Sequence, residues 1–389
     1  MQVGGNAMGK AHFELHDGDV LATVSGQIGL ITLNRAKALN ALSLSMVRDI
    51  TQVLLAWQTD DTVKAVAMRG MGREGAFGAF CAGGDIRFFH QAALAGDPQL
   101  EDFFTEEYAL NHLIHRYNKP CMVFMDGVVM GGGMGLAQGA SLRIATDKTK
   151  MAMPETMIGL FPDVGGGYFL SRCQGALGEY LGLTGHMLNG AEAVYAGLAD
   201  VLCPSADLTA LWDNLPTMDW QNADKAIQQI TQPYAAATAD AKAHSPVWWN
   251  EQLNSVFASA DVPTIANALA QHTDELSAVA LQALRKRSPL MLAVTLEQIR
   301  RARHMELADE LRMERDMVRH SFHPAHLQRG PAHSDTVEGI RALAVDKDHA
   351  PKWQPERLED ISADMVTPFF QSAWPVHAHP LRHLTDPTA

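Results

Sequence analysis

Three short segments hold the residues of this sequence that could do chemistry. Two are rich in glycine, residues 80–86 (FCAGGDI) and 130–135 (MGGGMG), and the third, residues 154–167, contains the carboxylates Glu155 and Asp163. Glycine has no Cβ, so each loop can take a positive φ and turn a backbone N–H toward a ligand. Two such N–H groups can bind a carbonyl oxygen as it becomes negatively charged. The pattern therefore predicts acyl chemistry at an oxyanion hole with two acids beside it.

The elements that must position these segments alternate between strands and helices. Strand-like runs occur at 28–33, 65–69 and 121–125, and helical runs occur at 43–57 and 103–117, which predicts an α/β core. Ser43 and Ser45 are candidate N-caps of the first helix. The strand at 121–125 leads into the second glycine loop, and a helix is expected to begin there.

The composition changes near residue 208 to long, polar, alanine-rich helical stretches. We therefore place a boundary near residue 215, with a catalytic core at 1–215 and a helical region at 216–389. The tail after residue 350 contains several prolines and ends in a histidine- and proline-containing stretch, which is expected to fray.

The formal net charge is −13 and no basic run is present, so nucleic acid and anionic membranes are not predicted partners. A polyanionic ligand such as coenzyme A (CoA) must then meet a local cluster of Lys and Arg. The four cysteines follow no disulfide or zinc spacing, residues 1–7 show no apolar leader, and no run of 18 apolar residues occurs. These features predict a cytoplasmic protein with reduced thiols.

Two competing motifs are not favoured. Residues 70–75 match GxGxxG, but another glycine loop follows instead of a helix, and no acid stands about twenty residues on to bind a ribose. The histidine pairs 112/115 and 320/323 have a three-residue spacing without an obvious third ligand, so no metal is predicted.

The three segments resemble motifs of the enoyl-CoA hydratase (crotonase) superfamily. Residues 153–170 (MPETMIGLFPDVGGGYFL) resemble more particularly the 3-hydroxyisobutyryl-CoA hydrolase family, and the similarity continues at 288–290 (SPL), 338–342 (EGIRA) and 351–353 (PKW). This resemblance implies a crotonase (ClpP-like) fold, a spiral of ββα units with a helical C-terminal extension. Residues 1–215 would then form the crotonase-like, acyl-CoA-binding catalytic core.

The implied activity is hydrolysis of 3-hydroxyisobutyryl-CoA, or a close 3-hydroxyacyl-CoA, to the free acid and CoA in valine catabolism. No cofactor is implied, because CoA is part of the substrate. Crotonases often form trimers or hexamers through C-terminal helices, whereas an enlarged extension could cover that surface, so a homo-oligomer and a monomer both stay open. The alternatives are an enoyl-CoA hydratase/isomerase and a noncatalytic acyl-CoA-binding protein.

The resemblance assigns the oxyanion hole to the N–H groups of Gly84 and Gly132. Glu155 matches a catalytic glutamate of the hydratases, but their second glutamate, three residues after the central glycine, is replaced by Gly135, which argues against hydration. Asp163 stands where the hydrolases keep their second acid. The alternative for Asp163 is a helix N-cap beside Pro162, and the two roles do not exclude each other.

The two acids next to an apolar Ile-Gly-Leu-Phe run are expected to differ, one with a raised pKa and the other ionised. Glu155 would attack the thioester or activate water, and Asp163 would position water or move a proton; the sequence leaves both routes open.

Three further sites follow from the resemblance. Glu107 matches a glutamate that contacts the substrate, where it could accept a hydrogen bond from a hydroxyl, although acidic helix faces are often only solvated. Arg87 is expected near the CoA phosphates, and the main chain at Lys37 and Ala38 near the adenine; the alternative for Arg87 and Lys37 is an exposed base with no ligand. Thr336 replaces an aromatic residue common in the hydrolases, and residues 223–243 match nothing in the family.

Overall fold

The computed structural model describes residues 15–386, so the expectation about residues 1–7 lies outside the described part. A central six-stranded sheet has the order β1-β2-β3-β4-β6-β8, and a separate parallel pair is formed by β5 and β7. Only β1 runs antiparallel to its neighbour, and the other strands of the large sheet are parallel. The strands are β1 (Val20–Ser25), β2 (Ile28–Leu33), β3 (Ala65–Gly70), β4 (Cys121–Met125), β5 (Val128–Met130), β6 (Leu142–Thr146), β7 (Lys150–Ala152) and β8 (Val201–Cys203).

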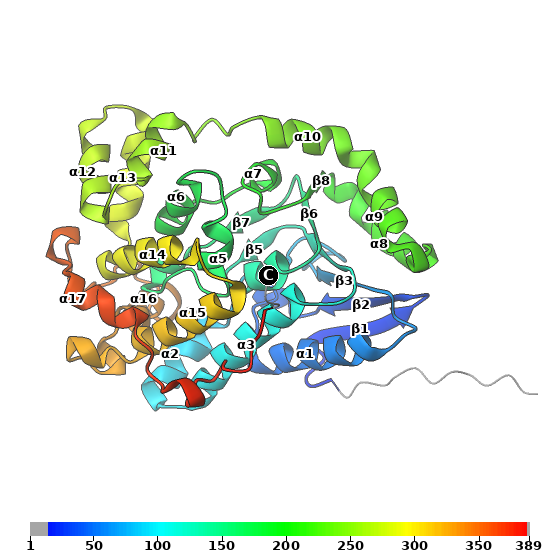
Figure 1. Ribbon diagram of the computed structural model, residues 1–389, viewed down its shortest axis with the longest axis horizontal. Helices are drawn as coiled ribbons and strands as arrows, with labels where there is room; N and C mark the ends of the chain where they lie inside the picture. Colours follow the sequence, from blue (N-terminus) through cyan, green and yellow to red (C-terminus); the bar gives the residue numbers. More distant parts are fainter. Residues whose placement is uncertain (1–14, 387–389) are drawn as a thin grey trace, which may run out of the picture.

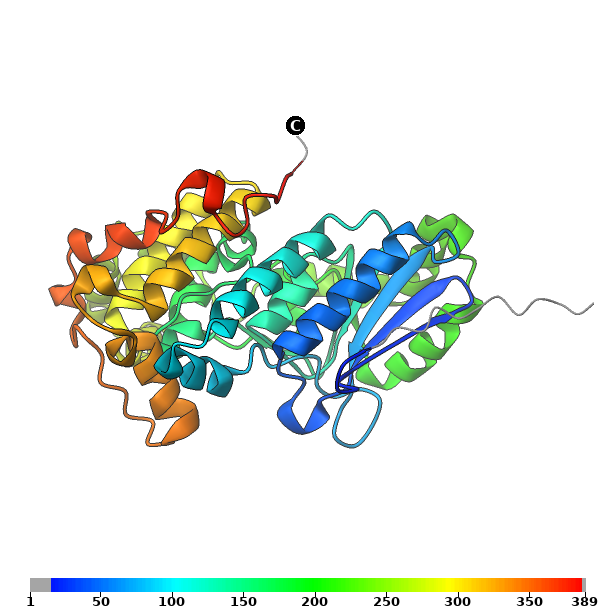
Figure 2. The same cartoon turned by 90° about the horizontal axis from the view of Figure 1, so that it is seen from below.

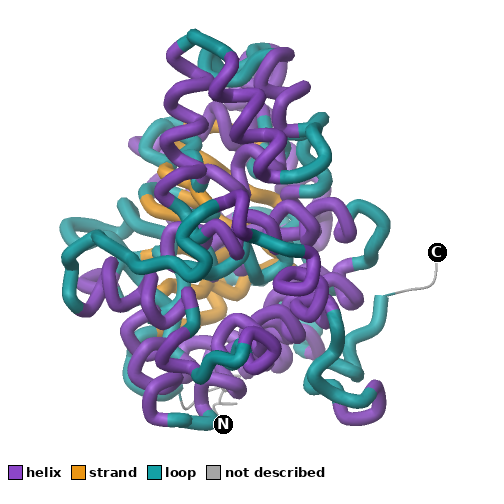
Figure 3. Tube along the Cα trace, turned by 90° about the vertical axis from the view of Figure 1, so that its left-hand side faces the viewer, coloured by secondary structure: helices purple, strands orange, loops and turns teal. Residues whose placement is uncertain are grey.

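Helices cover both faces of the large sheet, so most of its strands are buried, while the edge strand β1 is partly exposed (Figures 1 to 3). The helices that lead to the site are α1 (Leu44–Thr59), α2 (Ile86–Ala95), α3 (Gln99–His115), α4 (Gly132–Gln138), α5 (Gly166–Leu170), α6 (Leu177–Thr184) and α7 (Gly190–Tyr195). Those that follow are α8 (Leu208–Asn214), α9 (Ala223–Thr231), α10 (Ala235–Ala243), α11 (Glu251–Phe257), α12 (Val262–Gln271), α13 (Glu275–Lys286), α14 (Pro289–Ala302), α15 (Leu307–Phe322), α16 (Asp335–Ile340) and α17 (Ala363–Val366).

Alternating side chains of the strands feed two apolar clusters. In β4, Val123 and Met125 point into the cluster under α1 and α3, while Met122 and Phe124 point into the cluster under α8 and α9, as the two-residue period of a strand requires. The sequence predicted β2 and β4 at their observed bounds and β3 to within one residue. Of the two candidate caps Ser43 is confirmed, because its hydroxyl accepts a hydrogen bond from the Met46 N–H. Ser45 is not a cap, since it lies inside α1.

The alanine-rich segment 223–243, unmatched in the sequence, forms α9 and α10. Trp220, Ala226 and Ile230 close the sheet face opposite α1, away from the glycine loops. The two apolar clusters both continue across residue 215, so the boundary there stays a prediction made from composition.

The C-terminal helices α11 to α16 pack beside the core rather than on the sheet itself (Figure 1). The expectation that the final stretch of the tail frays is wrong for its described part, because Leu381 is buried in the main apolar cluster. Phe369, earlier in the tail, is buried in the same cluster. Within residues 15–386, no helix combines the length and the apolar composition needed to cross a membrane.

Candidate active site

Backbone pairing brings the two glycine loops together. The Cys81 N–H donates to Val128 O at 3.0 Å, and the Met130 N–H donates to Cys81 O at 3.0 Å, so the first loop is held along β5. On its other side the Leu42 N–H donates to Gly83 O at 2.8 Å. Gly83 has φ +102°, a conformation that L side chains rarely adopt. Segments about fifty residues apart in the chain thus end side by side.

Two backbone N–H groups are left free where the loops meet. Gly132 is the first residue of α4, whose opening N–H groups have no partner inside the helix. Within residues 15–386 neither the Gly84 N–H nor the Gly132 N–H has a hydrogen-bond acceptor. A Cβ placed on Gly132 would lie 3.4 Å from Gly84 N, so the two donors are neighbours. This is the arrangement that an oxyanion hole requires.

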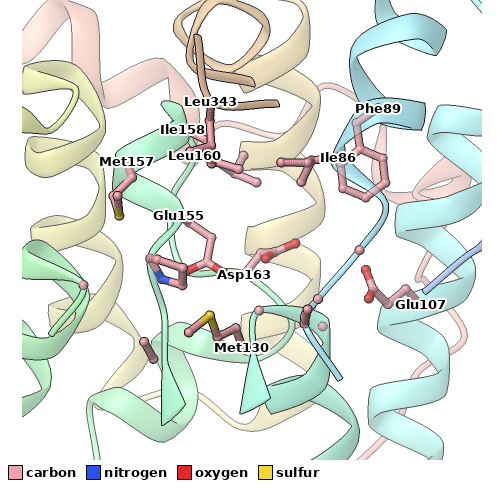
Figure 4. A pocket seen from close by; sticks show the side chains of 18 of the residues that line it. Ile86, Phe89, Glu107, Met130, Glu155, Met157, Ile158, Leu160, Asp163 and Leu343 are labelled. Atoms are coloured by element: carbon pink, nitrogen blue, oxygen red, sulfur yellow. The ribbon is translucent and has the colours of Figure 1, made fainter. Parts of the chain in front are cut away.

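The donors open into a cavity of about 330 Å³ that three carboxyl groups line. Glu107 from α3, Glu155 from the 3₁₀ turn Glu155–Ile158 and Asp163 are 2%, 6% and 5% exposed. Figure 4 shows Glu155 and Asp163 directed toward the middle of the cavity, with Glu107 on the opposite side. Apolar side chains form most of the remaining wall: Ile86, Phe89, Phe104, Met130, Met157, Ile158, Leu160, Met187 and Leu343.

Burial controls the ionisation of these acids. Desolvation raises the pKa of Asp163 to about 6, although the Tyr108 hydroxyl, which donates to Asp163 Oδ2 at 2.8 Å, opposes the rise. The pKa of Glu155 is raised well above its usual value by desolvation and then by the charge of Asp163. Desolvation and the same neighbour raise the pKa of Glu107. The sequence predicted one raised and one ordinary acid, but the closed apolar wall raises the pKa of both.

The loop that carries Asp163 is fixed from behind by α15. Glu314 accepts hydrogen bonds from the Gly165 N–H at 2.8 Å and the Gly167 N–H at 3.2 Å. Gln298 from α14 joins this network, donating to Glu314 Oε1 at 2.9 Å and to Pro162 O at 2.7 Å. Helix α5 begins only at Gly166, with Gly165 as its N-cap, so the interpretation of Asp163 as a helix cap is wrong.

The turn that carries Glu155 is fixed by α16. The hydroxyl of Thr336 donates to Gly159 O at 2.6 Å, and Gly159 has φ +68°. A Cβ on Gly159 would clash with Asp335 O, and one on Gly339 would clash with the main chain of Ile158. Thr336 is fully buried and does not line the cavity. Thr336, which stands where the hydrolases commonly have an aromatic residue, therefore does not directly enlarge the acyl pocket.

The structure brings together five of the eight predicted site residues: Gly84, Gly132, Glu107, Glu155 and Asp163. Arg87, Lys37 and Ala38 do not line this cavity; Arg87 and Lys37 are exposed, and they stay predictions for parts of a ligand beyond it. The neighbouring Arg35 pairs with Asp85 at 2.9 Å, which ties this segment to the first glycine loop. Among the described residues, no group of three or more His, Cys, Asp or Glu is placed to hold a metal ion.

Sequence reasoning missed Tyr108, Gln298 and Glu314. Tyr108 follows Glu107 directly, but nothing local indicates that its hydroxyl meets an acid 55 residues away. Glu310 and Glu314 are an acidic pair four residues apart on one face of α15, and both are fully buried. Such a pair among apolar residues is a signal that could have been used.

Comparison with known proteins agrees with this geometry. The model of the enoyl-CoA hydratase/isomerase family matches residues 28–370. The 3-hydroxyisobutyryl-CoA hydrolase, mitochondrial, of Xenopus tropicalis is 38% identical over 92% of this chain and 89% of its own length. The probable 3-hydroxyisobutyryl-CoA hydrolase 3 of Arabidopsis thaliana is 38% identical, with 90% and 91% covered.

Two solved structures are similar over almost the whole chain. A carnitinyl-CoA dehydratase from Mycobacterium thermoresistibile has a TM-score of 0.79 at 36% identity, with 94% of this chain and 99% of that chain covered. An enoyl-CoA hydratase from Rhodobacter sphaeroides has a TM-score of 0.75 at 33% identity, with 91% and 98% covered. The chain therefore belongs to the enoyl-CoA hydratase/isomerase family, and within it to the group of the 3-hydroxyisobutyryl-CoA hydrolases. The predicted crotonase fold is confirmed.

Proposed function

We propose that this chain hydrolyses the thioester of 3-hydroxyisobutyryl-CoA, or of a close 3-hydroxyacyl-CoA, to the free acid and CoA as a step of valine catabolism. The observation that carries the proposal is the pair of free N–H groups at Gly84 and Gly132 in one cavity with Glu155 and Asp163. The thioester oxygen accepts from both N–H groups, which stabilise the negative charge that develops when the carbonyl carbon is attacked.

The hydrogen bond from Tyr108 suggests how the two acids share the work. It stabilises the ionised form of Asp163, so in this proposal Asp163 is the carboxylate that takes a proton from water or from Glu155. In the first route water adds to the carbonyl carbon, the C–S bond breaks, and the thiolate takes up a proton. In the second route Glu155 passes its proton to Asp163 and attacks, giving an anhydride and the thiol, and water then cleaves the anhydride.

Glu107 supports a preference for acyl groups that carry a hydroxyl. Its Oε1 is buried and has no hydrogen-bond partner among the described residues, and it lies against Gly132. A hydroxyl on the acyl chain can donate to this oxygen, whereas an acyl group without one leaves it unpaired.

Enoyl-CoA hydration is the rival, because the two similar solved structures are titled a dehydratase and a hydratase. Concerted hydration uses an acid and a base, and the position that carries the second hydratase glutamate is Gly135. A Cβ there would lie 2.7 Å from Val164 Cβ and 2.8 Å from Asn111 Nδ2. The site therefore has no room for a carboxylate at residue 135, which favours hydrolysis.

The test compares three CoA esters on the native chain. Thiol release is expected from 3-hydroxyisobutyryl-CoA and, because Glu107 is left unpaired, at least about a hundredfold more slowly from isobutyryl-CoA. Crotonyl-CoA is followed for loss of its conjugated double bond. Hydration of crotonyl-CoA without thiol release from either ester would overturn the proposal.

The remaining expectations belong to the same proposal. No cofactor takes part, since CoA enters as part of the substrate. The four cysteines are buried free thiols, which suits the predicted cytoplasmic location. The vertebrate relatives, however, are named as mitochondrial proteins. Cell fractionation decides between the two compartments. The oligomeric state is measured by light scattering, and a monomer would mean that the C-terminal helices cover the surface that oligomeric crotonases share.

A further inference from the structure

The backbone next to Asp163 is strained. Val164 has φ +60°, and Gly165, which follows it, has φ +86°. Glycine adopts this left-handed conformation freely, but a β-branched side chain there crowds its own backbone. Among the non-glycine residues with a positive φ in the described chain, Val164 alone is β-branched, and it is only 3% exposed. A buried outlier of this kind beside an active-site acid indicates a functional constraint.

Val164 and Gly165 form the centre of a tight turn. The Gly166 N–H donates to Asp163 O at 2.8 Å, and both central residues have a positive φ, which is the pattern of a type I′ turn. Asparagine, aspartate and glycine are the residues that suit the first central position of such a turn. Valine is therefore a poor turn residue, and its presence at 164 must serve something other than the turn.

Asp163 and Val164 face different cavities. Asp163 lines the catalytic cavity, whereas Val164 lines a second cavity of about 180 Å³ together with Gly135 and Asn111. A Cβ on Gly135 would lie 2.7 Å from Val164 Cβ and 2.8 Å from Asn111 Nδ2. The Val164 side chain is thus wedged against α4, beside the Asn111 side chain of α3. These two helices also carry one donor of the oxyanion hole and one acid of the catalytic cavity.

Hydrogen bonds on both sides of Val164 hold the turn in this conformation. On one side the Tyr108 hydroxyl donates to Asp163 Oδ2 at 2.8 Å. On the other side Glu314 accepts from the Gly165 N–H at 2.8 Å. These contacts fix the two ends of the turn, and the wedged side chain fixes its middle. Without the wedge the turn is free to rotate, and the Asp163 carboxyl leaves its place in the catalytic cavity.

We propose that Val164 is a positioning residue, whose wedged side chain holds a strained turn so that the Asp163 carboxyl stays directed at the thioester. The assignment rests on the proposed function, because it takes Asp163 as the acid that moves the proton. The turn is less stable than it would be with glycine or asparagine at 164, and the acid is better placed. A displacement of about 1 Å in an active site can lower a rate by about 10²-fold.

The test compares Val164→Ala with Val164→Gly. Both variants lose the wedge, but only glycine relieves the strain, so the urea midpoint of Val164→Gly is expected to lie above that of Val164→Ala. For thiol release from 3-hydroxyisobutyryl-CoA, kcat is expected to fall at least about tenfold in both variants while KM stays native. A purely structural role predicts instead that kcat follows the urea midpoint. A kcat in Val164→Gly that returns to the native value would therefore overturn the proposal.

Two comparisons make the result specific. Val164→Ile keeps the branch at Cβ and can extend into the second cavity, so most of the native kcat should remain. Gln328 is exposed, has φ +56° and lines neither cavity. Gln328→Gly should again have a higher urea midpoint than Gln328→Ala, with a native kcat in both. The proposal would be overturned by a loss of kcat in Val164→Ile as large as in Val164→Ala, by a loss of kcat at residue 328, or by a higher midpoint for alanine than for glycine at residue 164.

A crystal structure of Val164→Gly keeps the proposal separate from the proposed function, because it needs no turnover. The Tyr108 hydroxyl lies 2.8 Å from Asp163 Oδ2 in the native chain, and in the variant this distance is expected to exceed about 3.5 Å. If the carboxyl moves in the variant but the native chain releases no thiol, the proposed reaction fails and the positioning role of Val164 stands. An Asp163 carboxyl that keeps its native position in the variant would overturn the proposal.

Discussion

Tyr108→Phe tests whether the ionisation of Asp163 governs hydrolysis. The change removes one hydroxyl, which donates to Asp163 Oδ2 at 2.8 Å, and leaves an aromatic ring to pack against Phe104 at 6.1 Å. The hydroxyl stabilises the ionised form of Asp163 and so lowers its pKa, against the larger effect of burial. Without it the pKa of Asp163 must rise.

The size of the effect follows from the strength of the lost hydrogen bond. A hydrogen bond to a charged group contributes about 1.5–3 kcal/mol, and one pKa unit corresponds to about 1.4 kcal/mol. The pKa of Asp163, about 6 in the native chain, is therefore expected to rise by about one to two units in the variant.

The assay is thiol release from 3-hydroxyisobutyryl-CoA between about pH 5 and about pH 9, where the acid limb of kcat/KM reports the base of the free enzyme. We expect that limb to move up by about one to two pH units in the variant, with much of the activity recovered at the alkaline end. Tyr234→Phe is the matched control, because Tyr234 donates to Asp207 at 3.0 Å outside the cavity.

An acid limb that stays in place in Tyr108→Phe would refute this reasoning. So would an equal loss of activity at every pH, since that result describes a disturbed site rather than a shifted base. Movement of the limb in Tyr234→Phe would show that the shift does not come from Asp163.

Three further predictions concern the elements around the site. Gly132→Ala would place a Cβ against Glu107 Oε1 beside the oxyanion hole and should lower kcat by about 10²–10³-fold. The control is Gly330→Ala, which should leave kcat unchanged because a Cβ there meets nothing within 4 Å. Equal kcat values for the two variants would contradict the assignment of Gly132 to the oxyanion hole. Glu314→Gln puts an amide N–H₂ against the N–H groups that Glu314 binds and should lower the free energy of unfolding, measured in urea, by about 1–3 kcal/mol. Glu310→Gln should lower it less. The reverse order would refute the role of Glu314 in fixing the loop that carries Asp163. Asp163→Asn should raise that free energy at about pH 7 by up to about 3 kcal/mol, because the folded pKa of about 6 lies above the reference value of 3.8. The cost of ionising the buried acid grows as the pH rises from the reference value and is complete only above the folded value, so the gain should shrink as the pH falls. A gain that persists unchanged at about pH 4 would contradict this origin.

The sequence predicted those parts of the site that lie in contiguous segments. The glycine loops and the acids at 155 and 163 are local patterns, and residues with no Cβ indicate a close approach of backbone and ligand wherever the fold places them. Strands β2 and β4 were predicted at their bounds because both are short apolar runs buried on both faces of the sheet.

The remaining features depend on contacts between distant segments. Tyr108 meets Asp163 across 55 residues, and Glu314 meets Gly165 across 149 residues, so no local pattern could reveal either contact. The final stretch of the tail was expected to fray because chain termini are often poorly ordered, yet Leu381 in that stretch and Phe369 before it are buried in the main apolar cluster and hold the tail in place.

The central claim is that Glu155 and Asp163 hydrolyse a thioester held at Gly84 and Gly132. It is tested most directly by thiol release from 3-hydroxyisobutyryl-CoA, with hydration of crotonyl-CoA followed in parallel, for the native chain, Glu155→Gln and Asp163→Asn. Thiol release by the native chain that collapses in both variants, each shown to be folded, is the predicted result. Crotonyl-CoA hydration with no thiol release, or thiol release that survives in both variants, would contradict the account.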